Sequence, residues 1–246
     1  MTYCVGLRLN RGLVFMSDTR TNAGLDDIAT YRKTFTWEVP GERVITVMTA
    51  GNLATTQKMI GLLNERIKRP SERELSITHT ETMFQVAQLV SSTLREVIAE
   101  HEQVGQNAGA FGASAIVGGQ IQGMEPRMFL IYAEGNFIET SSDTQFLQIG
   151  ETKYGRPILV RSYDPDMSFA AAAKLLLVSF DSTMKSNLSV GLPVDLSIYE
   201  ADSLKVGPQL RLTADHPDYR AVSENWSDAL RSAFDGLPAI QGLGVN

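Results

Sequence analysis

The chain has 246 residues, of which 43% are hydrophobic and 20% charged, a composition typical of a globular protein with a sizeable core. Its formal net charge is −6 at pH 7, whereas nucleic-acid-binding proteins usually carry a basic surplus, so we expect no nucleic-acid partner. The single cysteine, Cys4, excludes a disulfide framework within the chain and fits a reducing cytoplasm. The longest mainly apolar stretch, 169–178, is interrupted by Lys174 and is too short to span a bilayer, so we expect no membrane partner.

The sequence carries none of the usual signatures of a metal or nucleotide enzyme. Its histidines are far apart, and none lies at metal-ligand spacing from another histidine or from the cysteine, which argues against a zinc site. The phosphate-binding motifs GxxxxGK and GxGxxG are missing, as is the GxSxG motif of many serine hydrolases. We therefore expect no metal and no cofactor. The first residues alternate and include Arg8 and Arg11, so they do not predict a secretory signal peptide.

Hydrophobic periodicity and turn residues divide the chain into strands and helices. Strands are predicted over 3–9, 13–16, 44–48, 113–117, 127–133, 136–139, 146–149, 193–199 and 209–213. Helices are predicted over about 53–68, 80–102, 168–184 and 219–234. Pro70 is expected to close the first helix, and Ser168 is the expected N-cap of the third. Steps of three and four predict one buried face of the second helix, formed by Met83, Val86, Val90, Leu94 and Val97.

The order of these elements favours the α+β class. Strands, two helices, strands, one helix and strands follow one another in blocks, unlike the regular alternation of βαβ proteins. Two sheets packed face to face, with helices outside both, would bury the apolar strands and the helix faces together. Because no linker or repeat divides the chain, we expect a single domain over residues 1–246, with a C-terminal helical extension from about residue 214.

Hairpin geometry brings Thr2 close to an acidic residue. If Leu9 and Leu13 flank the first turn, the numbers of opposite residues sum to about 22, so that Cys4 faces Asp18. Asp18 then lies within two strand positions of Thr2, about 7 Å by strand rise. A carboxylate at the end of an apolar strand is costly unless it is paired.

Four residues around this hairpin form a coherent set for nucleophilic catalysis. A threonine hydroxyl is a weak nucleophile, and the base it needs could be the α-amine that Thr2 gains if Met1 is removed. Such an amine has a reference pKa of about 7.7 to 8.0, so part of it is neutral near pH 7. Lys33, brought back to the hairpin as the chain re-enters a strand, would lower the pKa of hydroxyl and amine, and Asp18 would orient it. The N–H of Gly51, in a tight bend after a strand, could stabilise the oxyanion.

The same residues also fit a purely structural interpretation. Threonine stands at position 2 by chance in many proteins. Asp18 could form a structural ion pair with Arg20 or with Lys33 at the end of a strand. Gly51 could serve only the turn that leads into the first helix.

The stretch from Thr2 to Phe35 resembles the N-terminus of proteasome β subunits and their bacterial relatives. The shared features are T-x-x-V-G, an apolar hairpin, S-D-T-R, and a lysine some thirty residues after the threonine. VMTAGNLA at 47–54 resembles the family's strand, turn and helix around an oxyanion glycine, and LQIGETKYG at 147–155 and DPDMSFAAAAK at 164–174 resemble later segments. The resemblance extends to about Ala201. The opening TYCVGLRL, the sequence SDTRTNAG and the C-terminal extension favour the bacterial Anbu branch, the "ancestral β subunit" type of proteasome homologue.

This resemblance implies the four-layer αββα sandwich of N-terminal nucleophile hydrolases. It implies that Thr2 is the nucleophile and its amine the base, that Asp18 and Lys33 are the activating pair, and that the Gly51 N–H is the oxyanion donor. Ser189 is assigned to the site from a segment that matches the family loosely. The positions that line the family's substrate cleft are matched by Thr21, Asn22, Thr49 and Leu53.

The chain departs from the family pattern at three points. Lys33 comes one residue early, which implies a deletion in the preceding loop. Glu151 stands where the family usually has an active-site serine, and a glutamate there could perturb the amine or bind a cation. The aspartate of the family's D-x-x-S-G segment has no match near Ser189.

Three functions are compatible with these observations. The first is a cytoplasmic threonine peptidase that cleaves peptides or unfolded proteins inside a self-compartmentalising homo-oligomer. The second is an amidase that attacks a non-protein amide with the same nucleophile. The third is a catalytically silent assembly subunit. A homo-oligomer is expected in each case, and whether it is a closed ring or a helical stack depends on a small rotation per subunit. An ATPase partner stays unknown from the sequence.

Overall fold

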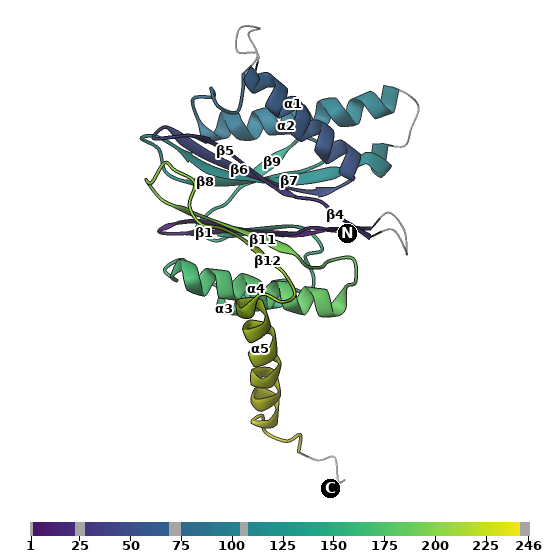
Figure 1. The fold of residues 1–246 in the computed structure, drawn as a ribbon, viewed down its shortest axis with the longest axis vertical. Coiled ribbons are helices and arrows are strands. Elements are labelled where there is room, and N and C mark those ends of the chain that lie inside the picture. The colour runs from purple at the N-terminus through teal and green to yellow at the C-terminus, as the bar shows by residue number, and fades with distance from the viewer. Residues whose placement is uncertain (1, 23–27, 69–74, 104–107, 242–246) are drawn as a thin grey trace.

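The computed structural model describes residues 2–22, 28–68, 75–103 and 108–241, and Figure 1 shows that they form four layers. Two helices cover one outer face, two sheets lie face to face in the middle, and two further helices cover the other outer face. A fifth helix projects from this last layer toward the C-terminus. The αββα sandwich that the sequence predicts is therefore confirmed.

The two central sheets have five antiparallel strands each. Sheet one has the order β10-β1-β2-β11-β12, formed by Phe146–Gly150, Tyr3–Leu9, Gly12–Asp18, Val194–Glu200 and Gln209–Leu212. Sheet two has the order β5-β6-β7-β8-β9, formed by Thr34–Val39, Arg43–Gly51, Ala113–Ile121, Arg127–Ile131 and Phe137–Glu139. A small hairpin pairs β3 with β4, formed by Arg20–Asn22 and Ile28–Thr30. The helices are α1 to α5, formed by Leu53–Lys68, Met83–Gln103, Arg156–Ser162, Phe169–Ser186 and Pro217–Asp235, and a 3-10 helix covers Ala108–Phe111.

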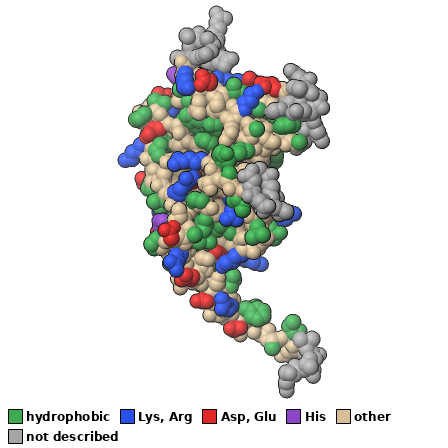
Figure 2. All heavy atoms as spheres, turned by 45° about the vertical axis from the view of Figure 1, so that its right-hand side comes forward, with side chains coloured by type: hydrophobic (Ala, Val, Ile, Leu, Met, Phe, Trp, Pro, Cys, Tyr) green, Lys and Arg blue, Asp and Glu red, His purple; other side chains and the backbone are tan. Residues whose placement is uncertain are grey.

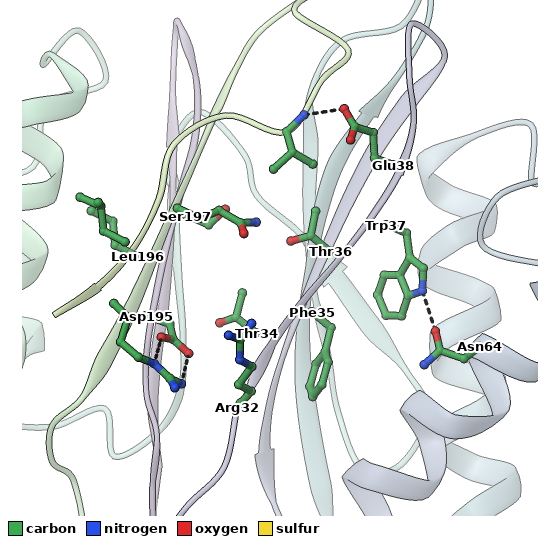
Figure 3. Close-up of a pocket in the computed structure, with 14 residues that line it drawn as sticks. Arg32, Thr34, Phe35, Thr36, Trp37, Glu38, Asn64, Asp195, Leu196 and Ser197 are labelled. Carbon is green, nitrogen blue, oxygen red and sulfur yellow. Dashed lines mark hydrogen bonds and ion pairs between the residues drawn. The ribbon is translucent and has the colours of Figure 1, made fainter. Parts of the chain in front are cut away.

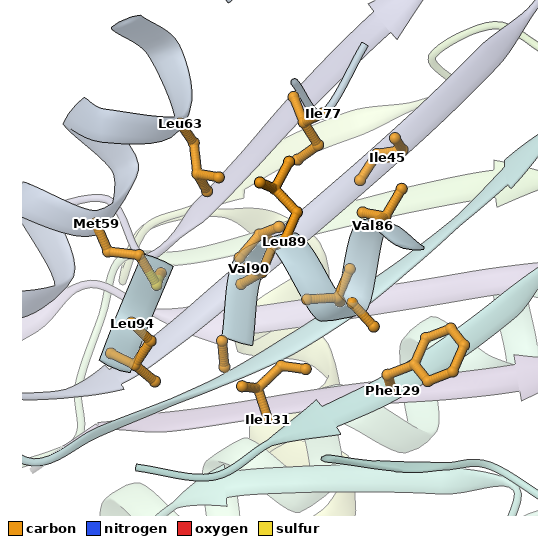
Figure 4. Packing of buried hydrophobic residues seen from close by; sticks show 14 of the residues in the cluster. Ile45, Met59, Leu63, Ile77, Val86, Leu89, Val90, Leu94, Phe129 and Ile131 are labelled. Atoms are coloured by element: carbon orange, nitrogen blue, oxygen red, sulfur yellow. The ribbon is translucent and has the colours of Figure 1, made fainter. Parts of the chain in front are cut away.

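Three buried apolar clusters hold the layers together. One lies between helices α1 and α2 and sheet two, and Figure 4 shows its side chains meeting between helix and strands. Another lies between sheet one and helices α3 and α4, and the third lies between the two sheets. The predicted buried face of α2 is confirmed, because its five residues are all fully buried: Met83, Val86, Val90, Leu94 and Val97.

The register predicted for the first hairpin is wrong by one residue. The observed pairs run from Leu9↔Gly12 to Cys4↔Ser17, so Cys4 does not face Asp18. The reason is that Gly12 is the first residue of β2 rather than the last of the turn, which leaves a two-residue turn. Gly12 has φ +145°, and a Cβ there would lie 2.0 Å from the carbonyl oxygen of Tyr199.

Local chemistry explains where other elements differ from the expectation. Helix α2 begins later than predicted because Thr82 and Gln85 form a capping box: Thr82 Oγ1 accepts from the Gln85 N–H, and Gln85 Oε1 accepts from the N–H groups of Glu81 and Thr82. The short helix α3, with a proline in its first turn, and the β3–β4 hairpin were not predicted. Ser168 caps α4 as expected, since its side chain accepts from the Ala171 N–H. Pro70 lies outside the described residues.

No helix in the described part of the chain combines the length and the apolar character that crossing a membrane requires. The same residues contain no group of three or more His, Cys, Asp or Glu side chains placed to hold a metal ion.

Candidate active site

A cavity of about 500 Å³ opens beside Thr2, where strand β6 leads into helix α1. Thr2 enters it from the start of sheet one, and Lys33 enters it from the segment just before β5. Gly51 closes it at the end of β6. The cavity therefore brings together the predicted nucleophile, one member of the predicted activating pair and the predicted oxyanion donor.

Asp18 lies at the end of β2 and is completely buried. Its Oδ1 accepts from Lys33 Nζ at 2.8 Å and from the Tyr3 N–H at 3.0 Å, and its Oδ2 accepts from the Gly191 N–H at 3.4 Å. Burial raises the pKa of this carboxyl, while the Lys33 ammonium and the two backbone N–H groups oppose that rise. The pair and the two N–H groups that bond Asp18 thus come from four separate segments of the chain.

Lys33 is nearly as buried as its partner, with 4% of its surface exposed. Besides Asp18, its ammonium donates to the carbonyl oxygen of Arg20 at 2.5 Å. An ammonium has three protons to donate, so two acceptors leave one proton for a further acceptor in the cavity that Lys33 shares with Thr2. Asp18 and the Arg20 carbonyl thus hold the lysine in place at the wall of the cavity that Thr2 also lines.

The backbone of Thr2 is fixed by the residue that follows strand β10. The Glu151 N–H donates to the Thr2 carbonyl oxygen at 2.6 Å. Gly150 makes this approach possible, because it has φ +82° and a Cβ there would lie 1.9 Å from the same oxygen. Thr2 is 8% exposed, so little of it other than the face that lines the cavity is open. Met1 lies outside the described residues, so its removal stays a prediction.

The orientation of Gly51 directs its N–H toward the cavity. In the antiparallel β6–β7 pair, Gly51 lies opposite Ala113 and the next N–H, of Asn52, donates to Gly112 O at 3.1 Å. Successive amides of a strand point to opposite sides, so the Gly51 N–H points away from β7. On that other side β5 begins only at Thr34, which pairs with Met48. Gly51 thus presents an N–H beyond the end of the neighbouring strand.

Three of the four predicted cleft residues line the same cavity: Thr21, Thr49 and Leu53. Asn22 pairs through its backbone with Ile28 in the small hairpin, and its side chain lies outside the described part of the structure. Arg32 and Phe35 also line the cavity and were not predicted. Both follow the β3–β4 hairpin, whose place beside Thr2 the sequence pattern did not reveal.

Arg32 and Phe35 also line a second cavity, of about 690 Å³, between the edges of the two sheets. Figure 3 shows β5 on one side of it and β11 with β12 on the other. An ion pair between Arg211 and Asp195 forms part of its wall, with Nε to Oδ1 at 2.7 Å. The two cavities are therefore neighbours that share Arg32 and Phe35.

Ser189 and Glu151 are not among the residues that line the Thr2 cavity. Ser189 lies in the segment that joins α4 to β11, where its N–H donates to Asn187 Oδ1 at 2.9 Å. Glu151 is 8% exposed, and its Oε2 accepts from Asn187 Nδ2 at 3.0 Å. The sequence analysis did not single out Asn187 or Gly191, although the missing aspartate of this segment pointed to the right stretch.

Comparisons with known proteins agree with this geometry. The family model described as "Proteasome subunit" matches residues 2–198. The chain therefore belongs to the proteasome subunit family, with the N-terminal nucleophile hydrolase fold. No curated protein sequence matched.

Solved structures point to one branch of this family. The chain is similar to a mutant of Anbu from Hyphomicrobium sp. strain MC1, with 48% identity, a TM-score of 0.91 and coverage of 98% of this chain and 100% of that one. It is similar to Anbu, the ancestral β subunit, from Yersinia bercovieri, with 43% identity, a TM-score of 0.91 and the same coverage. A third structure, the helical assembly of the Anbu complex from Pseudomonas aeruginosa, has 44% identity, a TM-score of 0.92 and coverage of 99% and 100%. The predicted resemblance to Anbu is confirmed.

Proposed function

We propose that this protein is a threonine peptidase of the bacterial proteasome type, active in the cytoplasm after Met1 is removed. The observation that carries the proposal is the buried Asp18–Lys33 pair, which lies against the cavity that Thr2 and the Gly51 N–H share. A buried ion pair at a cavity wall adds little to stability by itself. It is well suited to hold an ammonium beside a nucleophile.

The reaction follows from the roles of these groups. The Thr2 α-amine takes the hydroxyl proton, and Thr2 Oγ1 attacks the carbonyl carbon of the substrate amide. Negative charge then develops on the carbonyl oxygen, where the Gly51 N–H stabilises it. The amine returns the proton to the leaving nitrogen, and water hydrolyses the ester on Thr2. Lys33 lowers the pKa of the hydroxyl throughout, because its positive charge favours the alkoxide.

The substrate class is a peptide or an unfolded protein. Thr21 and Thr49 line the cavity near strand ends, where an extended chain can pair with backbone groups, and Leu53 and Phe35 add apolar surface. The further cavity along β5 extends this surface in one direction. A small non-protein amide would contact only a small part of the surface that lines these two cavities.

We also propose that the protein is a homo-oligomer built from single-domain subunits that span residues 1–246. Helix α5 supports this, because none of its residues is buried. It packs partly through Tyr219 and Val222 on the cluster under sheet one. Figure 2 shows it projecting from the body of the subunit, with apolar side chains toward its end. Exposed apolar groups of this kind fit contacts between subunits, in a ring or in a helical stack.

The test is labelling of Thr2 by a β-lactone. Intact-mass analysis should find the chain without Met1, and the lactone should add one acyl group to Thr2. Both Thr2→Ala and Lys33→Ala should abolish labelling, whereas Lys68→Ala, an exposed lysine of α1, should not. A chain that keeps Met1 quantitatively and takes no label contradicts the proposal. Labelling together with turnover of a small amide but of no peptide would favour an amidase.

A further inference from the structure

The segment between α4 and β11 contacts the Asp18–Lys33 pair, and none of its residues lines the Thr2 cavity. Its Gly191 N–H donates to Asp18 Oδ2. Arg20 Nη1 donates to the Leu188 carbonyl oxygen at 2.9 Å, and the Arg20 carbonyl oxygen in turn accepts from Lys33. This segment, residues 187–191, therefore contacts the activating pair both directly and through Arg20.

Asn187 determines the shape of this segment. It is the C-cap of α4, and its N–H donates to the Thr183 carbonyl oxygen at 2.8 Å. Its Oδ1 accepts from the Ser189 N–H, and its own carbonyl oxygen accepts from the Val190 N–H at 3.2 Å. With both oxygens engaged by the next residues, Asn187 folds the chain into the turn that directs Gly191 toward Asp18.

Glu151 links this turn to the nucleophile. Its Oε2 accepts from the Asn187 side-chain amide at 3.0 Å, and its Oε1 accepts from the Lys153 N–H at 3.2 Å. Its own N–H donates to the Thr2 carbonyl oxygen. One residue thus contacts both the backbone of the nucleophile and the segment behind Asp18. Bonds to a carboxylate are stronger than neutral ones, so this link resists opening.

We propose that Glu151 and Asn187 are a pair of positioning residues. Together they hold the Gly191 N–H against Asp18 and keep the backbone of Thr2 in a fixed position relative to Asp18. The proposal rests on the proposed function, because it assigns these residues a part in activating Thr2. Neither residue lines the Thr2 cavity, so each acts through another group. Glu151 in this site is therefore a structural link between two segments rather than a replacement nucleophile or base.

The consequence concerns the charge on Asp18. The charged and titratable groups that interact with it are the Lys33 ammonium and the Cys4 thiol from β1, while the Arg20 guanidinium lies beside Gly191. Burial raises the pKa of Asp18, and the Gly191 N–H is one of the groups that lower it. If the Gly191 N–H moves away, Asp18 takes up a proton at a higher pH and Lys33 loses its counter-charge.

A polarity swap tests the pair. Asn187→Asp places a second carboxylate about 3 Å from Glu151, and like charges at that distance repel. Combining it with Glu151→Gln restores a donor and an acceptor in reverse order, while both contacts to backbone N–H groups are kept. The exposed Glu224→Gln on α5 is the matched control.

Two measurements are made on each assembled protein. The first is the second-order rate constant of Thr2 labelling by the β-lactone as a function of pH. We expect Asn187→Asp to label about tenfold more slowly and the double variant to return to within about threefold of wild type. The second is the pH at which Asp18 protonates, followed by its carboxyl ¹³C signal, assigned with Asp18→Asn. We expect it to rise by about one unit in Asn187→Asp and to fall back in the double variant.

The outcomes separate the two proposals. If wild type is not labelled but the Asp18 midpoint moves and returns as expected, the peptidase proposal fails and the positioning pair stands. If wild type is labelled but neither the rate nor the midpoint responds to Asn187→Asp, the positioning pair is overturned and the peptidase proposal stands. A double variant no better than Asn187→Asp also overturns the pair, because the restored hydrogen bond should then position the Gly191 N–H again.

Discussion

Two regions of this molecule use polar and apolar residues in opposite ways. Around Thr2, charged and hydroxyl groups are buried: Asp18 is 0% and Lys33 4% exposed, and each is held by partners distant in sequence. On α5, apolar groups are exposed: Leu230 is 49% and Phe234 73% exposed. The first arrangement buries an ion pair beside the cavity that Thr2 lines. The second leaves apolar side chains of α5 without a packing partner in the same subunit. The difference teaches that one subunit buries the residues around Thr2 by itself, whereas it does not cover the apolar surface of α5.

The largest effect is expected from Lys33→Ala, which would break the buried pair. Removing one member leaves Asp18 as an uncompensated buried charge, so the free energy of unfolding should fall by about 3–5 kcal/mol. Chemical denaturation at one fixed protein concentration measures this, with Lys68→Ala as control, since its ion pair is exposed. If the free energy of unfolding falls by the same small amount in both variants, the Asp18–Lys33 pair is accessible to solvent.

The next effect is an alkaline loss of stability that involves Tyr3. Its hydroxyl is buried and bonded to Ser179 and Gln148, and burial raises its pKa to about 12. The neutral form is favoured in the folded state, so the stabilisation is complete below pH 10 and is lost as pH rises through 12. This loss amounts to about 2.7 kcal/mol at most. Denaturation midpoints between pH 9 and 12 should fall less steeply for Tyr3→Phe than for wild type. Equal slopes would contradict this prediction.

A smaller effect on stability is expected from Gly51→Ala. Gly51 has φ +113°, and a Cβ would lie 2.5 Å from the Gly112 carbonyl oxygen, so we expect a loss of about 1–3 kcal/mol. The matched control is Gly41→Ala, because Gly41 also has a positive φ of +77° but nothing within 4 Å of its Cβ. Labelling of Thr2 should fall at least tenfold in Gly51→Ala only, since the N–H that we propose as oxyanion donor shifts. If Thr2 is labelled at similar rates in both variants, Gly51 has no role in the reaction.

The smallest effect on subunit stability is expected at α5. Replacing Leu230 and Phe234 together by glutamate changes exposed positions, so the free energy of unfolding should change by less than about 0.5 kcal/mol. The assembly should nevertheless become smaller, as measured by light scattering, while Arg231→Glu on the same helix leaves it unchanged. An unchanged mass for the double variant would show that α5 lies outside the subunit contacts.

Periodicity predicted the parts of the fold that depend on local pattern. The buried face of α2 repeats at helical spacing, and Ser168 precedes an apolar run, so both could be predicted from nearby residues. The hairpin register could not, because it depends on Gly12 fitting against Tyr199 of a strand nearly two hundred residues later. Helix α3 was missed because seven residues that begin beside a proline give too short a pattern.

The candidate site divides in the same way. The sequence by itself determined which residue types were available: a threonine at position 2, an aspartate ending an apolar strand, a lysine before the next strand and a glycine at a bend. These four residues could be singled out from the sequence because each occupies a position in a local motif. Only the tertiary structure decided that Glu151 and Asn187 meet behind them, since they are 36 residues apart and come from different elements. Contacts between distant segments form only when the layers pack, and in this protein they fix the positions of Thr2 and of the Asp18–Lys33 pair.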